Sequence, residues 1–241
     1  MPAPRTGPPR GFVQALFSAV APTYDLLNTV LSFGLHHLWR RRAADLACLT
    51  PGDIALDVCT GTGDFALELC RRVGPQGAVV GVDFCEPMLQ VGLRKHQMRP
   101  GANRCAPILV LADAMQLPFP DNQFSAATVG FGVRNVEDIQ RAFAELARVV
   151  RPGGKVVCLE LARPRGKLFR ALYAVYFKGV LPWIGKLIHG RRESYAYLPE
   201  SLARFPERDE LAAIMRRAGL ADVSVLDLTA GIVAVHSGRV P

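Results

Sequence analysis

Continuous apolar runs alternate with helical patterns between residues 51 and 162. The apolar runs are Ile54–Val58, Ala78–Val82, Ile108–Leu111, Phe124–Val129 and Lys155–Leu161, and the helical patterns are Phe65–Val73, Pro87–His96 and Glu137–Val150. Because apolar residues are continuous in these runs rather than alternating with polar ones, each run predicts a strand covered on both faces. The alternation therefore predicts a parallel sheet with right-handed crossovers and helices on both faces.

The regions on either side extend this pattern. Residues 12–50 have helical spacing, and Pro51-Gly52 ends it. Near the other end we expect a helix followed by two strands, at Glu207–Ala218, Val223–Leu228 and Gly231–His236. The short connection Thr229-Ala230 makes the last two strands an antiparallel hairpin. The complete prediction is an α/β fold whose sheet has seven strands, six of them parallel and the last antiparallel.

We expect one domain, at residues 12–241, after a flexible tail at 1–11 that is rich in Pro and Arg. Its predicted parts are a helical N-terminal cap (12–50), a ligand-binding core (51–162), a helical cover over the substrate (163–205) and a final helix with its hairpin (206–241). Within the cover, Leu168–His189 is aromatic, basic and apolar. Pro182 interrupts this stretch, which is therefore not a clean membrane span.

Composition narrows the function only a little. The net charge of +8 suits nucleic acid, anionic lipid or an anionic ligand equally well. The six cysteines form no C-x-x-C pair and have no His at zinc-finger spacing, so we expect no metal site and a reducing, cytoplasmic location. The N-terminus has no apolar segment of the kind found in secretory signals. His36, His37 and His189 match no motif, and we expect them at the surface.

A glycine-rich segment, Asp57-Val-Cys-Thr-Gly-Thr-Gly-Asp64, directly follows the first predicted strand. Gly61 and Gly63 allow the backbone to approach a ligand closely. The third glycine of a dinucleotide fingerprint is absent, and Asp64 would repel a pyrophosphate. Two later strand ends carry Asp83, placed to accept ribose hydroxyls, and Asp113-Ala114, placed at an adenine edge. These positions favour a nucleoside cofactor without phosphate over a simple tight turn.

Further motifs resemble the UbiE/MenG family of ubiquinone and menaquinone C-methyltransferases, over roughly residues 12–241. The most specific motifs are F-x-x-V-A-x-x-Y-D and G-F-G-x-R-N-V; the matching segments are Phe17–Asn28, Leu38–Arg40, Asp113–Asn122, Gly130–Val136, Glu193–Leu198 and Leu228–Ala234. The resemblance implies a Rossmann-like class I fold and S-adenosylmethionine as cofactor. It implies methylation of a prenylated quinol on a ring carbon, with Thr60, Asp83, Asp113 and Ala114 contacting the cofactor.

The family pattern also bears on the substrate and on two loop positions. Some members have Ser where this chain has Gly130, at the expected cofactor site, so a side-chain contact is lost there. The position of Cys59 varies in the family, and Cys is small enough to fit. Gly130 resembles members that make only menaquinone, which favours demethylmenaquinol as substrate; a benzoquinol of the ubiquinone pathway, or another small apolar substrate, stays open.

The chemistry requires help in ionising a phenol-type hydroxyl, whose pKa is near 10. Arg134 and Asn135 are the first candidates, since Arg134 can stabilise the resulting oxyanion although it cannot act as a normal base. Asn135 could instead cap a helix. Tyr24 and Asp25 are second candidates, on a segment expected to close over the site, with helix packing and capping as the alternative.

Partners and rival functions remain open at this point. A prenylated substrate in lipid suggests peripheral contact with the inner face of the membrane, and a homodimer stays open. A nucleic-acid methyltransferase would suit the positive charge, but the chain has no N-P-P-Y-type motif and no clear RNA-binding module. A non-catalytic scaffold that retains the fold is the remaining alternative.

Overall fold

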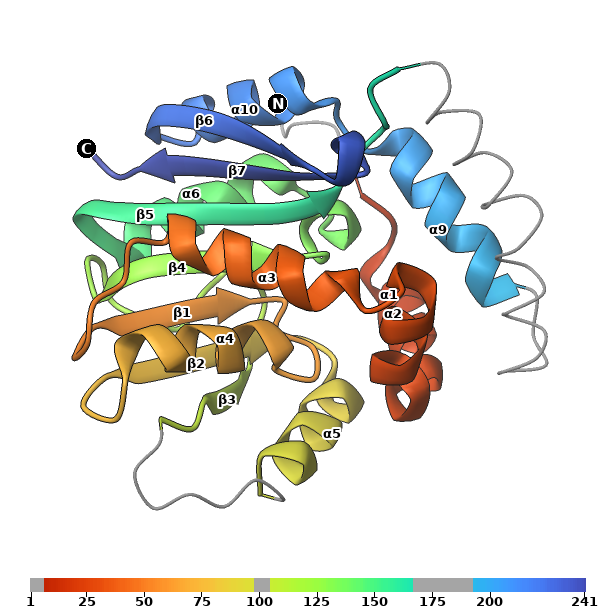
Figure 1. The fold of residues 1–241 in the computed structure, drawn as a ribbon, viewed down its shortest axis with the longest axis horizontal. Helices are drawn as coiled ribbons and strands as arrows, with labels where there is room; N and C mark the ends of the chain where they lie inside the picture. Colours follow the sequence, from red (N-terminus) through yellow and green to blue (C-terminus); the bar gives the residue numbers. More distant parts are fainter. Residues whose placement is uncertain (1–6, 98–104, 167–192) are drawn as a thin grey trace.

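Seven strands form one sheet in a computed structural model that describes residues 7–97, 105–166 and 193–241. Their spatial order is β3-β2-β1-β4-β5-β7-β6 (Figure 1). The strands are β1 (Ile54–Val58), β2 (Ala78–Asp83), β3 (Ile108–Leu111), β4 (Phe124–Gly130), β5 (Val150–Leu161), β6 (Ala221–Leu228) and β7 (Val233–Arg239). Only β7 runs against its neighbours, pairing antiparallel with both β5 and β6. The predicted arrangement of six parallel strands and a last antiparallel one is confirmed.

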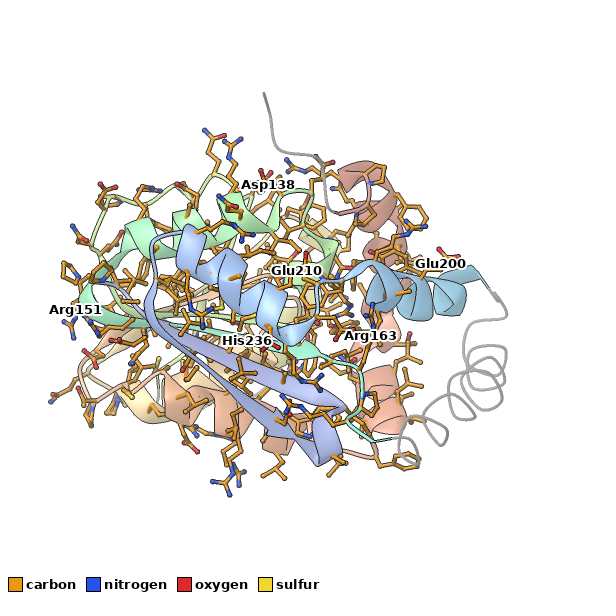
Figure 2. The ribbon with its side chains drawn as sticks, turned by 90° about the horizontal axis from the view of Figure 1, so that it is seen from above. Asp138, Arg151, Arg163, Glu200, Glu210 and His236 are labelled. Atoms are coloured by element: carbon orange, nitrogen blue, oxygen red, sulfur yellow. The ribbon has the colours of Figure 1, made fainter. Side chains whose placement is uncertain are left out.

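Helices cover both faces of the sheet, as the continuous apolar strands require. The described helices are α1 (Arg10–Val20), α2 (Tyr24–Ser32), α3 (Leu35–Leu46), α4 (Asp64–Val73), α5 (Glu86–Gln97), α6 (Ile139–Val149), α9 (Glu193–Arg204) and α10 (Arg208–Arg217). One core cluster packs α3 and α4 against the sheet, and another packs α6 and α10. Asp138, labelled in Figure 2, begins α6 by accepting a hydrogen bond from the Arg141 N–H at 2.9 Å.

Several boundaries differ from those expected, and the starts of β5 and β7 are among them. β5 begins at Val150 rather than Lys155, because the backbone is already extended at the residue after α6. The irregular Pro152-Gly153-Gly154 segment is accommodated by a register shift between β4 and β5. The β6–β7 connection is a 3-10 turn, Thr229–Gly231, so β7 starts two residues later than expected.

The N-terminal segment contacts the domain from Gly7 onward, within the range expected to be a tail. The Gly7 N–H donates to the Glu137 carbonyl at 3.2 Å. Helix α1 begins at Arg10, directly after Pro9. Residues 1–6 lie outside the described part of the chain.

Most of the predicted helical cover, including the aromatic and basic stretch Leu168–His189, also lies outside the described residues. Its described end contains α9, which lies beside α1 and α2 in Figure 1. Within the described ranges, every helix is too short or too polar to cross a bilayer.

Candidate active site

A cavity opens at the carboxyl ends of β1, β2, β3 and β4, where the sheet order reverses between β1 and β4. Ligands of open α/β sheets bind at such a reversal. The cavity encloses about 710 Å³ of empty space, part of it continuous with solvent, and helices α1 and α2 close its outer side. This size suits a nucleoside-sized ligand.

The glycine-rich loop after β1 forms one wall of the cavity. Gly61 has φ +58°, and an added Cβ would lie 3.1 Å from the Met88 methyl group, so a side chain there would strain the backbone and displace Met88. The Thr60 hydroxyl faces away from the cavity and donates to Asp57 at 2.6 Å. Thr60 therefore shapes the loop instead of lining the cavity.

Asp57 supports the loop from beneath. Its buried carboxylate accepts hydrogen bonds from the Thr60 and Thr128 hydroxyls, the second at 2.7 Å. Burial raises the pKa of Asp57 to about 6, although both hydrogen bonds act to lower it. The carboxylate is thus held charged at neutral pH at a cost in stability.

Asp83, at the end of β2, lines the cavity. One carboxylate oxygen accepts the Gly61 N–H at 2.8 Å and the other accepts the Cys85 N–H at 2.9 Å. Burial raises the pKa of Asp83, and these N–H groups oppose that shift. Each oxygen keeps a further lone pair, so the carboxylate can still accept two ligand hydroxyls.

Asp113 and Ala114, after β3, also line the cavity. The Asp113 carboxylate accepts the Met115 N–H at 2.8 Å and forms an ion pair with Arg10 at 2.9 Å. Arg10 also lies over the Phe84 ring, 5.4 Å from its centroid. Arg10 was missed in the sequence because the Pro- and Arg-rich composition around it is typical of a tail.

Gly63 and Gly130 do not line the cavity. Gly63 precedes the first residue of α4 with φ +81°, and a side chain there would collide with the His96 ring. A Cβ at Gly130 would lie 2.6 Å from the buried Phe65 ring. Both glycines are therefore explained by helix geometry and packing.

Arg134 is enclosed in a buried ion pair. Its guanidinium donates to Glu160 at 2.7 Å and to the Phe131 carbonyl at 2.8 Å, and the two side chains are only 9% and 1% exposed. The Glu160 charge raises the pKa of Arg134 against the opposing effect of burial. The Arg134 Nε lies buried without a partner among the described residues, so one donor remains available.

Asn135 lines the main cavity, and its side-chain oxygen accepts the Tyr197 hydroxyl at 2.7 Å. Tyr197 lies on α9 and helps line a second, smaller cavity, which Arg134 also lines; its empty space of about 300 Å³ includes open solvent. Asn135 and Tyr197 therefore stand between the two cavities. Tyr197 belongs to a segment quoted for the family resemblance, but nothing in the sequence pairs it with a residue 62 positions away.

The side chains of Tyr24 and Asp25 have different surroundings, although the two residues are adjacent in the sequence. Tyr24 lines the main cavity, and burial raises the pKa of its hydroxyl against the lowering effect of Arg40. Asp25 instead accepts the Thr62 hydroxyl at 2.6 Å and pairs with Lys95 at 2.8 Å, and it does not line the cavity. Asp25 thus ties α2 to α5 and the glycine-rich loop.

Expectations from the sequence also concern the histidines and Cys59. His36 is buried against Arg40, not at the surface, and burial lowers its pKa to about 4. His37 is exposed, and His189 lies outside the described residues. Cys59 lines the cavity with φ +56°, and burial raises the pKa of its thiol, so it is no nucleophile at neutral pH.

The lining fits the cofactor implied by the sequence. Three carboxylates, Asp83, Asp113 and Glu137, line the cavity. Among the described residues its one lining Arg, Arg10, is already paired with Asp113, which suits a cationic nucleoside and disfavours a phosphate. Among the described residues, no group of three His, Cys, Asp or Glu side chains could hold a metal ion.

Known proteins of similar sequence were found over nearly the whole chain. A model described as the ubiE/COQ5 methyltransferase family matches residues 6–240. The demethylmenaquinone methyltransferase of Staphylococcus carnosus (strain TM300) is 43% identical over 226 residues, which cover 94% of this chain and 92% of that protein.

Solved structures share the fold at much lower identity. The [4+2]-cyclase SpnF has a TM-score of 0.71 at 18% identity, covering 98% of this chain and 97% of that one. A SAM-dependent methyltransferase of Thermotoga maritima has a TM-score of 0.65 at 20% identity, covering 95% and 99%. These likenesses show a common fold and carry no information about the substrate.

Proposed function

Because the chain belongs to the ubiE/COQ5 methyltransferase family, we propose that it methylates a ring carbon of a prenylated quinol, with demethylmenaquinol as the substrate. The observation that carries this proposal is the 43% identity, over 94% of the chain, to a demethylmenaquinone methyltransferase. The benzoquinol of the ubiquinone pathway is the alternative substrate, and the experiment below separates the two.

The cofactor site in this proposal is the cavity beside the glycine-rich loop. S-adenosylmethionine supplies, when bound, an electrophilic methyl group on a sulfonium sulfur. Gly61 leaves room for it, the Asp83 carboxylate accepts its ribose hydroxyls, and Asp113 and Ala114 bound its adenine. Thr60, Gly63 and Gly130 contribute by shaping this pocket and packing behind it.

The reacting ring carbon becomes nucleophilic when its neighbouring hydroxyl is ionised. Arg134 keeps its positive charge and has one unused donor, Nε, with which to stabilise the oxyanion. The raised pKa of Tyr24 keeps that hydroxyl protonated at neutral pH, so it can donate a hydrogen bond but cannot serve as a base. The proton therefore leaves through water, while Asn135 orients the ring.

The second cavity, beside Tyr197 and Arg134, gives a place to the part of the substrate remote from the reacting carbon, while the ring itself must meet the methyl group in the main cavity. It is separate from the main cavity, and its lining combines aromatic and apolar side chains with two arginines: Pro8, Arg134, Ile139, Tyr197, Ser201, Arg204, Phe205 and Pro206. The apolar lining suits a prenyl chain, and the two arginines suit an anionic oxygen at the ring end of that chain.

Contact with the membrane surface remains part of the proposal, since a prenylated quinol resides in lipid. Exposed apolar side chains on α2 and near its end, Leu26, Val30 and Phe33, are consistent with such contact. Flotation of the protein with anionic vesicles would test it, and recovery only in the unbound fraction would contradict it. A homodimer and a cytoplasmic location stay predictions.

The central test supplies labelled S-adenosylmethionine with chemically reduced demethylmenaquinone or its benzoquinol counterpart. We expect label on the naphthoquinol ring at a rate well above that on the benzoquinol. Label on neither ring would overturn the proposed reaction, and faster labelling of the benzoquinol would overturn the choice of substrate.

Matched variants connect the reaction to the cavity. Asp83→Ala should lose most cofactor affinity in calorimetry, whereas Asp121→Ala, an exposed carboxylate that does not line the cavity, should bind like wild type. Arg134→Ala should bind the cofactor normally and turn over poorly. Normal turnover in Arg134→Ala would exclude Arg134 from the chemistry.

A further inference from the structure

Two cysteines have their sulfur atoms in contact at a place far from the active site. Cys70 lies in the second half of α4, and Cys105 precedes β3. Their Sγ atoms are 2.6 Å apart. All six cysteines lie within the described residues, and only these two have sulfurs in contact with each other. A separation this short lies much nearer to a sulfur–sulfur bond, about 2.05 Å, than to an ordinary non-bonded contact.

We propose that Cys70 and Cys105 are a reversible thiol–disulfide pair that an organic or inorganic hydroperoxide oxidises. The close approach means that the bond can form after a short movement of the two sulfur atoms toward each other. The proposal is independent of the methyltransferase reaction, because neither cysteine lines either cavity described above.

The surroundings of the two thiols assign them different roles. Cys70 is buried in the core cluster beneath α4, and Cys105 packs against the same cluster but is partly exposed. Burial, together with the adjacent Cys105 thiol, raises the pKa of Cys70, so Cys70 stays protonated at neutral pH. Cys105 is therefore the sulfur that a dissolved oxidant reaches first.

Oxidation of the pair takes place in two steps. The Cys105 thiolate attacks one peroxide oxygen, the O–O bond breaks, and a sulfenic acid and one water form from hydrogen peroxide. The Cys70 sulfur then attacks the Cys105 sulfur, the S–O bond breaks, and hydroxide leaves as water with the Cys70 proton. Two thiols lose two electrons and two protons, and one peroxide becomes two waters. A dithiol reductant reverses the change.

The bond would connect two residues 35 positions apart, on either side of β2 and α5. Closing a loop of this length restricts the unfolded chain more than the native one. Oxidation should therefore raise the melting temperature, by about 5 °C or more, without altering cofactor affinity.

The test treats the full-length protein with hydrogen peroxide, blocks remaining thiols by alkylation and maps the tryptic peptides by mass spectrometry. No Lys or Arg lies between residues 43 and 70, so Cys48, Cys59 and Cys70 share one peptide, whereas Cys105 is the only cysteine in its own. Fragment spectra must therefore identify Cys70 as the partner of Cys105. We expect that linked peptide in the oxidised sample and its loss after dithiothreitol.

Single variants separate this pair from general thiol oxidation. Cys105→Ser should give no linked peptide and no rise in melting temperature, whereas Cys48→Ser, an exposed cysteine elsewhere, should behave like wild type. Cys70→Ala should leave a sulfenic acid on Cys105 that a dimedone probe traps. The proposal is overturned if no Cys70–Cys105 peptide forms, if Cys105 links as readily to Cys48, or if linkage leaves the melting temperature unchanged.

Discussion

Removing the charge of Asp57 should change how stability depends on pH. Its folded-state pKa of about 6 stands above the unfolded value of 3.8 because the carboxyl group is buried beneath the glycine-rich loop. A raised carboxyl pKa means that the folded state binds more protons than the unfolded state between these values. The contribution of Asp57 to the stability of the wild-type protein should therefore fall as the pH rises from about 4 to about 6.

The size of the effect follows from the same two values. At about 1.36 kcal/mol per pKa unit, the full loss is about 3 kcal/mol. About 2 kcal/mol of this falls between pH 4.5 and pH 7, a range in which other carboxyl groups disturb the measurement less. Asp57→Asn lacks the ionisation and should not show this component.

The assay is urea unfolding of wild type and Asp57→Asn at several pH values across that range. The difference in unfolding free energy between the two proteins should shift by about 2 kcal/mol in favour of the variant from the lowest to the highest pH. Asp121→Asn, an exposed carboxylate, serves as control and should show a much smaller shift. A constant difference between wild type and Asp57→Asn would refute the reasoning.

Three further substitutions test contacts of the site. Glu160→Gln should lower the free energy of unfolding by about 3 kcal/mol in urea titrations, because it leaves the buried Arg134 charge uncompensated; a loss below about 1 kcal/mol would contradict this. Gly130→Ser should lower the melting temperature, because the new Cβ displaces the Phe65 ring, and unchanged melting would show that the ring moves freely. Tyr197→Phe should reduce kcat about fivefold with unchanged cofactor affinity in calorimetry, because one hydrogen bond of about 1 kcal/mol orients the neighbouring amide; equal kcat would exclude that role.

The sequence predicts the sheet well because its strands are buried on both faces and therefore apolar without interruption. It also predicts Gly61, Asp83 and Asp113 in one cavity, because parallel strands bring their carboxyl ends to the same edge. These inferences depend only on strand direction and order along the chain.

Other site residues could not be assigned from the sequence because neighbours on a helix point in different directions. Successive side chains differ by about 100° around the axis, so only one of Tyr24 and Asp25 can face the cavity. A sequence motif that contains both residues therefore cannot indicate which of them faces the cavity. The contacts of Arg10 and Tyr197 could not be predicted either, because their partners, Asp113 and Asn135, are 103 and 62 positions away and no local pattern indicates such pairs.

The position of β7 inside the sheet has a consequence for how the chain folds during synthesis. β7 is the last strand made, yet it fills the gap between β5 and β6. Until Val233–Arg239 has emerged, β5 presents an unpaired edge of up to seven residues. The nascent protein must therefore keep that edge from pairing with another chain, and a truncation that removes β7 alone would expose two further edges, one on β5 and one on β6.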